Sequence, residues 1–144
     1  MTRPTNDVEA AFGAARLSPQ RREIVSATAT LRGAFTVEEL SRAARARDEG
    51  IGTATVYRAV AALEASGWLE RVGERDGSAL YAHCHAGQRH HHHVVCESCG
   101  RVEATECPVT VASEAHSDGF RITRHEVTLY GICPACSAAK AMEA

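Results

Sequence analysis

Cysteine and histidine are the residues of this sequence with the greatest capacity for chemistry, and they gather in its second half. Four of the six cysteines form two Cys-x-x-Cys pairs, Cys96 with Cys99 and Cys133 with Cys136. Two such pairs offer four thiolates, the ligand set of a closed tetrahedral zinc site. Because four cysteines leave no open position on the metal, the pattern predicts a structural zinc rather than a catalytic one. The competing interpretation is a set of buried thiols or a redox pair.

A run of four histidines leads directly into the apolar pair Val94-Val95. In an extended strand, side chains alternate between the two faces. A single run of this kind therefore offers two metal sites, one on each face. The alternatives are an affinity tag or a flexible polar tract. Alternation places His91 and His93 on one face, and His90 and His92 on the other.

Cys84 precedes the histidine run and is a candidate soft ligand. One thiolate combined with two imidazoles favours zinc over iron(II) or manganese(II). Isolated histidines are weaker candidates, because most histidines lie on the surface or in a core. These weaker candidates are His83, His85, His116 and His125.

The composition is that of a globular chain of 144 residues, with 44% hydrophobic and 24% charged residues. The formal net charge is −2, so any binding to nucleic acid must depend on a local basic patch. We find no apolar run long enough to span a membrane and no signal-peptide pattern, and we therefore expect a cytoplasmic protein. In that reducing compartment, paired cysteines indicate metal binding rather than disulfides.

The first half of the sequence predicts three helices followed by a β-hairpin. Ser18 and Thr36 are expected N-caps of the first two helices, and a third helix is expected over about 53–66. Strands are expected over 68–72 and 79–83, around a tight turn. This order of elements is the outline of a winged helix-turn-helix domain.

The third helix carries Thr55, Tyr57 and Arg58 near its start, outside its apolar stripe. When such a helix enters the major groove, side chains of these types reach phosphates and base edges. We therefore predict double-stranded DNA as a partner. The alternative is that Tyr57 packs inside the protein.

The second half predicts short strands, one helix and no regular element across residues 83–89. We expect an α+β protein, in which a winged helix-turn-helix is followed by a small mixed α/β dimerisation domain with a structural zinc. The predicted domains are residues 1–83 and 84–144, and residues 1–15 are expected to have little structure. The expected elements of the second half are strands over 90–95, 101–105 and 121–130 and a helix over 108–117.

Three stretches together resemble the ferric-uptake-regulator family, and its zinc-sensing branch in particular. They are Leu17-Ser18-Pro19-Gln20-Arg21, Thr55-Val56-Tyr57-Arg58, and the histidine run with its two cysteine pairs. The resemblance covers about residues 16–137. It implies a homodimeric winged-helix repressor of zinc-uptake genes, in which metal at the hinge sets the angle between domains and permits binding to a palindromic operator.

The resemblance also assigns roles to individual residues. It makes the four paired cysteines the structural zinc site, and it implies that Tyr57 and Arg58 read the major groove while Arg16 approaches the minor groove. Its regulatory zinc site at the hinge falls on Glu70, Cys84, His91 and His93. Its third site, within the dimerisation domain, falls on His90, His92 and His125.

This sequence departs from the family pattern in two places. Cys84 lies two residues further from Cys96 than is usual, so His85 is an alternative ligand. The third site also lacks an obvious carboxylate, for which Glu106 and Glu114 are candidates. The resemblance assigns no role to Cys107.

Other functions remain as alternatives. Within the family, an iron-sensing regulator would prefer a hinge site of histidines and carboxylates, and a peroxide sensor would use iron-catalysed oxidation of a ligand histidine. Cys84 argues against both. A small zinc hydrolase could use Glu70, His91 and His93 around an open metal position, but no general-base motif accompanies them. A metallochaperone would have no use for the Thr-Val-Tyr-Arg helix. We therefore expect neither an enzyme nor a small-molecule substrate.

Overall fold

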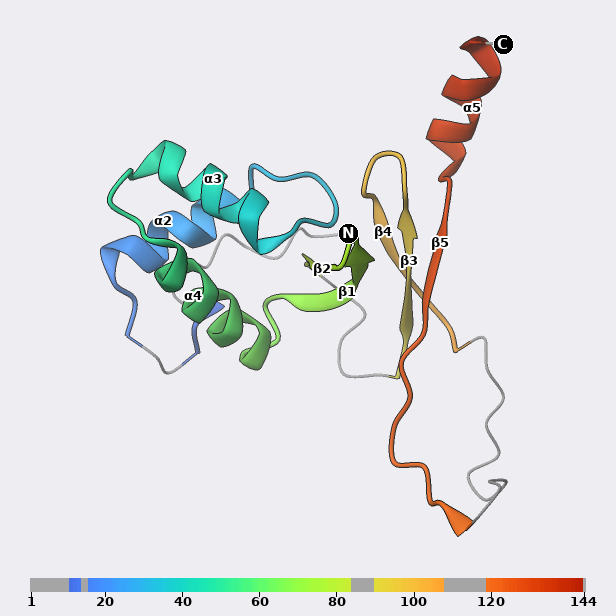
Figure 1. Ribbon diagram of the computed structural model, residues 1–144, viewed down its shortest axis with the longest axis horizontal. Helices are drawn as coiled ribbons and strands as arrows, with labels where there is room; N and C mark the ends of the chain where they lie inside the picture. Colours follow the sequence, from blue (N-terminus) through green and yellow to red (C-terminus); the bar gives the residue numbers. More distant parts are fainter. Residues whose placement is uncertain (1–10, 14–15, 84–89, 108–118, 144) are drawn as a thin grey trace.

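The computed structural model describes residues 11–13, 16–83, 90–107 and 119–143. Three helices and a β-hairpin form one lobe, and a three-stranded sheet with a terminal helix forms the other (Figure 1). The elements of the first lobe are α2 (Pro19–Thr28), α3 (Val37–Arg47), α4 (Thr53–Ala65), β1 (Glu70–Arg75) and β2 (Ser78–Ala82). Those of the second are β3 (His92–Cys96), β4 (Val102–Thr105), β5 (Thr128–Gly131) and α5 (Pro134–Glu143).

The helices of the first lobe begin where the sequence places their caps. The Ser18 hydroxyl accepts a hydrogen bond from the N–H of Arg21 at 3.2 Å, and Pro19 opens α2. Thr36 and Glu39 form the reciprocal capping box of α3, with bonds of 3.2 and 2.9 Å. These bonds satisfy N–H groups that the first turn of a helix leaves without a partner.

The main core lies between α2, α3 and α4. Its fully buried side chains include Ile24, Leu40 and Leu63, one from each helix. Phe12 also packs in this core and is only 4% exposed. The prediction that residues 1–15 contribute little structure is therefore wrong for Phe12, because a large aromatic ring gains much free energy by burial even among small neighbours in the sequence.

The hairpin β1–β2 is the wing of the first lobe. Its turn lies at Asp76 and Gly77, whose φ angles of 52° and 79° are those of a two-residue type I′ turn. Asp76 and Gly77 both favour this left-handed backbone. Because the turn is so short, β1 continues to Arg75, beyond the predicted end of the strand at residue 72.

The sheet of the second lobe has β3 at its centre, with β4 antiparallel on one side and β5 parallel on the other. The predicted strand over 121–130 is too long, because β5 pairs only from Thr128, opposite His93. Because β3 begins only at His92, the residues before Thr128 have almost no strand beside them with which to form backbone hydrogen bonds. Helix α5 was not predicted at all, although Pro134 at its start and four alanines favour a helix. The predicted helix over 108–117 lies outside the described residues.

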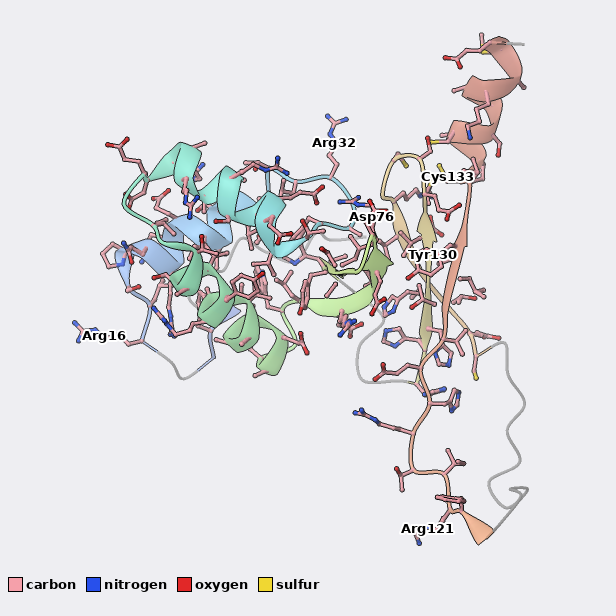
Figure 2. All side chains as sticks on the ribbon, in the orientation of Figure 1. Arg16, Arg32, Asp76, Arg121, Tyr130 and Cys133 are labelled. Atoms are coloured by element: carbon pink, nitrogen blue, oxygen red, sulfur yellow. The ribbon has the colours of Figure 1, made fainter. Side chains whose placement is uncertain are left out.

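The two lobes meet where the wing packs against the sheet. Val72, Leu80 and Val95 are buried together in a second, smaller core. The Thr128 hydroxyl donates to the carbonyl of Val72 at 2.9 Å, and the N–H of Glu74 donates to the Tyr130 hydroxyl at 2.7 Å. In Figure 2, Tyr130 lies beside Asp76 at the tip of the wing.

The cysteine turn of the sheet also touches the helical lobe. The N–H of Ala34 donates to the carbonyl of Gly100 at 2.6 Å. A Cβ on Gly33 would lie 2.1 Å from that oxygen, so only glycine fits there, and its φ of 68° also requires it. The α+β class and the two-lobe architecture are confirmed, while the exact domain boundary at residues 83 and 84 stays a prediction.

Candidate metal sites and DNA-facing helix

The four paired cysteines meet at one end of the three-stranded sheet. Cys96 ends β3, Cys99 lies in the following turn, Cys133 precedes α5 and Cys136 lies in its first turn. Figure 2 shows Cys133 at this end of the sheet, next to α5. All four Sγ atoms lie within 4.8 Å of one another, and those of Cys99 and Cys133 are 3.8 Å apart. A tetrahedron of Zn–S bonds of about 2.3 Å has edges of about 3.8 Å. The geometry of the cluster therefore fits zinc.

Backbone hydrogen bonds prepare Cys96 to bind metal as a thiolate. The N–H of Cys133 donates to Cys96 Sγ at 3.3 Å. Together with N–H groups of the Cys96–Cys99 turn, it lowers the pKa of the Cys96 thiol to about 6, because these donors stabilise the charged form. The thiolate is the form that binds metal, so the fold itself favours coordination.

A second cluster lies at the junction of the two lobes and contains Glu70, His91 and His93. Glu70 begins β1 of the wing, His91 directly precedes β3, and His93 is the second residue of β3. The Nε2 atoms of His91 and His93 each lie 3.1 Å from the same oxygen, Oε2 of Glu70. Tetrahedral zinc ligands with bonds of 2.0–2.1 Å lie about 3.3 Å apart. Three of the four predicted hinge ligands thus converge, and Cys84 and its alternative His85 lie outside the described residues.

The environment of His93 fits a metal ligand better than a core residue. His93 is only 8% exposed, and its Nε2, although 3.1 Å from Glu70 Oε2, makes no hydrogen bond of good geometry among the described residues. Burial lowers the pKa of His93, against the opposing influence of the Glu70 carboxylate. The imidazole is therefore neutral, as a metal ligand must be. A buried imidazole nitrogen without a well-formed hydrogen bond is costly unless it binds another group, such as a metal ion.

A third cluster lies on the opposite face of β3 and consists of His90, His92, Cys107 and His125. The Nε2 atoms of His90 and His92 both lie 3.2 Å from Nε2 of His125, and Cys107 Sγ lies 3.1 Å from it. Burial, followed by the neighbouring imidazoles, lowers the pKa of His92. The predicted alternation of the histidine run is confirmed, since its two pairs join two different clusters.

Sequence reasoning missed Cys107 and sought a carboxylate in its place. Glu106 is exposed and outside the cluster, and Glu114 lies outside the described residues. The signal that could have revealed Cys107 is its position two residues after the strand that pairs with the histidine run. In the antiparallel register, Thr105 pairs with His92, so continuing the register places Cys107 opposite His90.

Helix α4 presents the residues predicted to contact DNA. Val56, on its buried face, is fully enclosed, whereas Tyr57 is 51% exposed and Arg58 is exposed. The alternative in which Tyr57 packs inside is thus excluded. The Arg58 guanidinium donates to the Thr55 hydroxyl at 3.3 Å, so the two polar side chains lie together on the helix surface. Arg16 is also exposed and lies at the far side of the helical lobe from the sheet (Figure 2).

Comparison with known proteins identifies the family of this chain. The model of the Ferric uptake regulator family matches residues 13–130. The chain belongs to the ferric uptake regulator family. As a member of this family it is a metal-dependent transcription regulator and not an enzyme, and the hydrolase interpretation of the hinge cluster is set aside.

Relatives within the ferric uptake regulator family have different metals in their names. The "Zinc uptake regulation protein" of Mycobacterium tuberculosis is 33% identical over 124 residues, covering 84% of this chain and 94% of that protein. The "Ferric uptake regulation protein" of Legionella pneumophila is 34% identical over 108 residues, covering 71% and 76% of the two chains. Identity alone therefore does not select the metal.

Among solved structures, the family member described as "Zinc Uptake Regulator Complexed With Zinc AND DNA" has a TM-score of 0.71. It is 25% identical, and the match covers 92% of this chain and 91% of that one. In the part of the present chain that the structure describes, no helix is both long and apolar enough to cross a membrane.

Proposed function

We propose that this chain is a zinc-responsive homodimeric transcriptional repressor that binds palindromic operators of zinc-uptake genes. The observation that carries the proposal is the hinge cluster, in which Glu70 of the wing meets His91 and His93 of the sheet within 3.1 Å. A metal bound there would hold both lobes at once. Its regulatory site would consist of Glu70, Cys84, His91 and His93, and the four paired cysteines would hold the structural zinc.

The hinge cluster would act by favouring one angle between the lobes. Zinc can shift the equilibrium between angles only by its difference in affinity for them. Moving it from mostly open to mostly closed requires a preference of about 5.5 kcal/mol. Opening the hinge would separate Glu70 from both histidines, so the open form would lose a ligand. Polar contacts from Thr128 and Tyr130 to the wing would support the closed form.

The proposed DNA interface is the exposed surface of α4. Thr55, Tyr57 and Arg58 would enter the major groove, and Arg16 would approach the minor groove. This assignment is supported by their exposure and by the likeness to the zinc uptake regulator solved in complex with zinc and DNA. A regulator of this kind would act in the cytoplasm, where bacterial DNA lies.

The proposed homodimer would bury the apolar side chains that β5 and its flanking segments expose. Ile122, Leu129 and Ile132 are each about two-fifths exposed, and Phe120 is 73% exposed. Helix α5 has no buried residue. Large apolar side chains gathered on one segment favour association with another copy. A palindromic operator would then match the two-fold symmetry of the dimer.

Iron is the second candidate for the sensed metal. Among the described residues, the hinge donors are one carboxylate and two imidazoles, a set that also suits iron(II). The thiolate of Cys84 favours zinc, and so does the mycobacterial relative with its greater coverage of the chain. A peroxide-sensing regulator would also use iron at this site.

The decisive experiment measures DNA binding as a function of each metal. Operator DNA is selected from a random-sequence pool with the zinc-loaded protein. Fluorescence anisotropy then follows binding in buffered zinc(II), iron(II) and manganese(II). We expect activation at the lowest free concentration with zinc. Activation by iron(II) at concentrations where zinc is inactive would refute the zinc assignment and favour the iron sensor.

Histidine variants test which cluster is the sensor. His91→Ala and His93→Ala should stay folded and dimeric, retain zinc at the four cysteines, and lose zinc-activated DNA binding. His90→Ala is the matched control, because it removes an adjacent imidazole of the same run from the opposite face. It should only moderate the response. Equal effects of all three substitutions would contradict the assignment of the hinge cluster as the sensor.

A further inference from the structure

The cluster on the second face of β3 draws its residues from three separate segments. His92 begins β3 and His90 shortly precedes it, Cys107 follows β4, and His125 precedes β5. Both strand registers lead to this point. Continued beyond His92, the antiparallel register places Cys107 opposite His90, and the parallel register, in which His93 pairs with Thr128, places His125 there as well. The fold therefore brings these side chains together from both edges of the same strand.

The distances within the cluster suit a four-coordinate metal. Nε2 of His125 lies 3.2 Å from Nε2 of both His90 and His92, and 3.1 Å from Cys107 Sγ. All four donor atoms lie within 4.8 Å of one another. Bonds of 2.0–2.1 Å to imidazole place tetrahedral nitrogen ligands about 3.3 Å apart. The histidines are thus already at the spacing that a bound ion requires.

Among the described residues, no carboxylate supplies the fourth ligand beside the three histidines of this cluster. Glu106 is adjacent in sequence to Cys107, but it is exposed and does not belong to the cluster. Along a strand-like segment, neighbouring side chains point to opposite faces, so Cys107 and Glu106 cannot both face the histidines. The sulfur of Cys107 is the donor that this backbone presents.

We propose that Cys107 is the fourth ligand of a third metal site, formed with His90, His92 and His125, that binds zinc and similar thiophilic divalent cations. The proposal extends the zinc-dependent function proposed above, but it does not require the hinge cluster to be the sensor. One thiolate and three imidazoles disfavour manganese(II) and iron(II), which prefer harder donors. Four protein ligands leave no open position, so the site is structural and not catalytic.

A metal at this site would cross-link the base of the sheet. Cys107 and His125 are 18 residues apart in the chain, so their shared metal closes the connection between β4 and β5. His125 also lies shortly before Thr128, which donates to the wing at Val72. The third site thus fixes the segment that leads into the contact between the lobes.

Metal binding changes one existing contact in the cluster. The N–H of Val127 donates to Nδ1 of His92 at 3.0 Å, so the ring proton of neutral His92 lies on Nε2. Binding a metal through Nε2 replaces that proton, and the ring proton then belongs on Nδ1. The contact with Val127 is therefore exchanged for the metal bond. Protection of the Val127 amide from hydrogen exchange should report this change.

Cadmium-113 NMR tests the ligand assignment directly, because the chemical shift reports how many sulfur atoms bind the ion. The protein is loaded with cadmium-113 alone, and the spectra of the full chain and its variants are compared. Three resonances are expected, one for each cluster of ligands. Cys107→Ser should abolish one resonance or move it to a position typical of sites without sulfur. His125→Ala should affect the same resonance, whereas Glu106→Gln and Glu114→Gln are matched controls that should leave it unchanged.

Two further measurements distinguish the loss of a ligand from a folding defect in Cys107→Ser. Circular dichroism must show Cys107→Ser folded, and Cys107→His should restore the resonance at a shift without sulfur. The proposal would be overturned if the unmodified protein gave no third resonance, or if Cys107→Ser left that resonance unchanged. Loss of the third resonance in Glu106→Gln or Glu114→Gln would also overturn it. DNA binding of the same variants is measured separately. Failure of zinc activation in the unmodified protein would refute the proposed function while leaving the third-site result intact.

Discussion

A single methyl group added at Gly73 should weaken zinc-activated DNA binding without touching a metal ligand or α4. Gly73 lies in the wing directly beneath β5. A Cβ at this position would lie 2.7 Å from the Tyr130 hydroxyl, 3.0 Å from Thr128 Cγ2 and 3.2 Å from Tyr130 Cζ. A contact below 3.0 Å cannot persist, so either the Tyr130 side chain or the wing itself must shift in Gly73→Ala, and either shift disturbs the hydrogen bond between Glu74 and Tyr130 that joins the lobes. The closed arrangement of the lobes is the state that this movement disfavours.

The magnitude of the effect follows from the cost of overpacking a tight contact. That cost is about 1–3 kcal/mol, which corresponds to a change of about 5- to 150-fold in the equilibrium between open and closed forms. DNA binding at fixed free zinc should weaken by a factor in this range. The assay is fluorescence anisotropy with the selected operator, together with small-angle X-ray scattering of the free protein, which should show a larger radius of gyration.

Two further variants test the reasoning behind Gly73→Ala. Gly131→Ala is the matched control, because a Cβ there has nothing within 4 Å and should change neither measurement. Tyr130→Phe removes the nearest clashing atom and also the acceptor for the N–H of Glu74. Alone it should weaken binding by about 2- to 12-fold, for a lost bond of about 0.5–1.5 kcal/mol. In the Gly73→Ala background it should cost less or even restore binding. Equal behaviour of Gly73→Ala and Gly131→Ala would refute this account of the hinge.

Three other substitutions test the remaining parts of the argument. Cys96→Ser should give a monomeric or unfolded second lobe, measured by sedimentation and metal content, because structural zinc contributes much of the folding energy of a small domain; a folded zinc-free dimer would contradict this. Arg58→Ala should weaken operator binding by about 1–3 kcal/mol at fixed salt if it reads a base, and unchanged affinity would exclude Arg58 from the interface. Leu63→Ala should lower the free energy of unfolding by about 2–5 kcal/mol in urea titrations, since Leu63 is fully buried, and a smaller loss would mean that the cavity collapses.

The sequence by itself determined the features that depend on short-range geometry. Ser18 and Thr36 cap their helices because a hydroxyl needs only the next turn to find its partner. The histidine run divides into two pairs because side chains of any extended strand alternate. The cysteine pairs are recognisable because each forms within a single turn. In each case the required partner lies within a few residues, so the pattern is visible without the fold.

Only the tertiary structure decided which distant residues complete the metal clusters. Glu70 meets His91 because the wing packs on β3 through Val72 and Val95, and the resemblance to a family, rather than any local pattern, predicted that contact. Cys107 went unassigned because its place depends on the register of β4 against β3. The end of β5 depends on where β3 begins, and Phe12 enters a core built by later helices. These features depend on contacts between residues far apart in the chain. In the sheet, a shift of one residue in register would move every side chain of a strand to the opposite face.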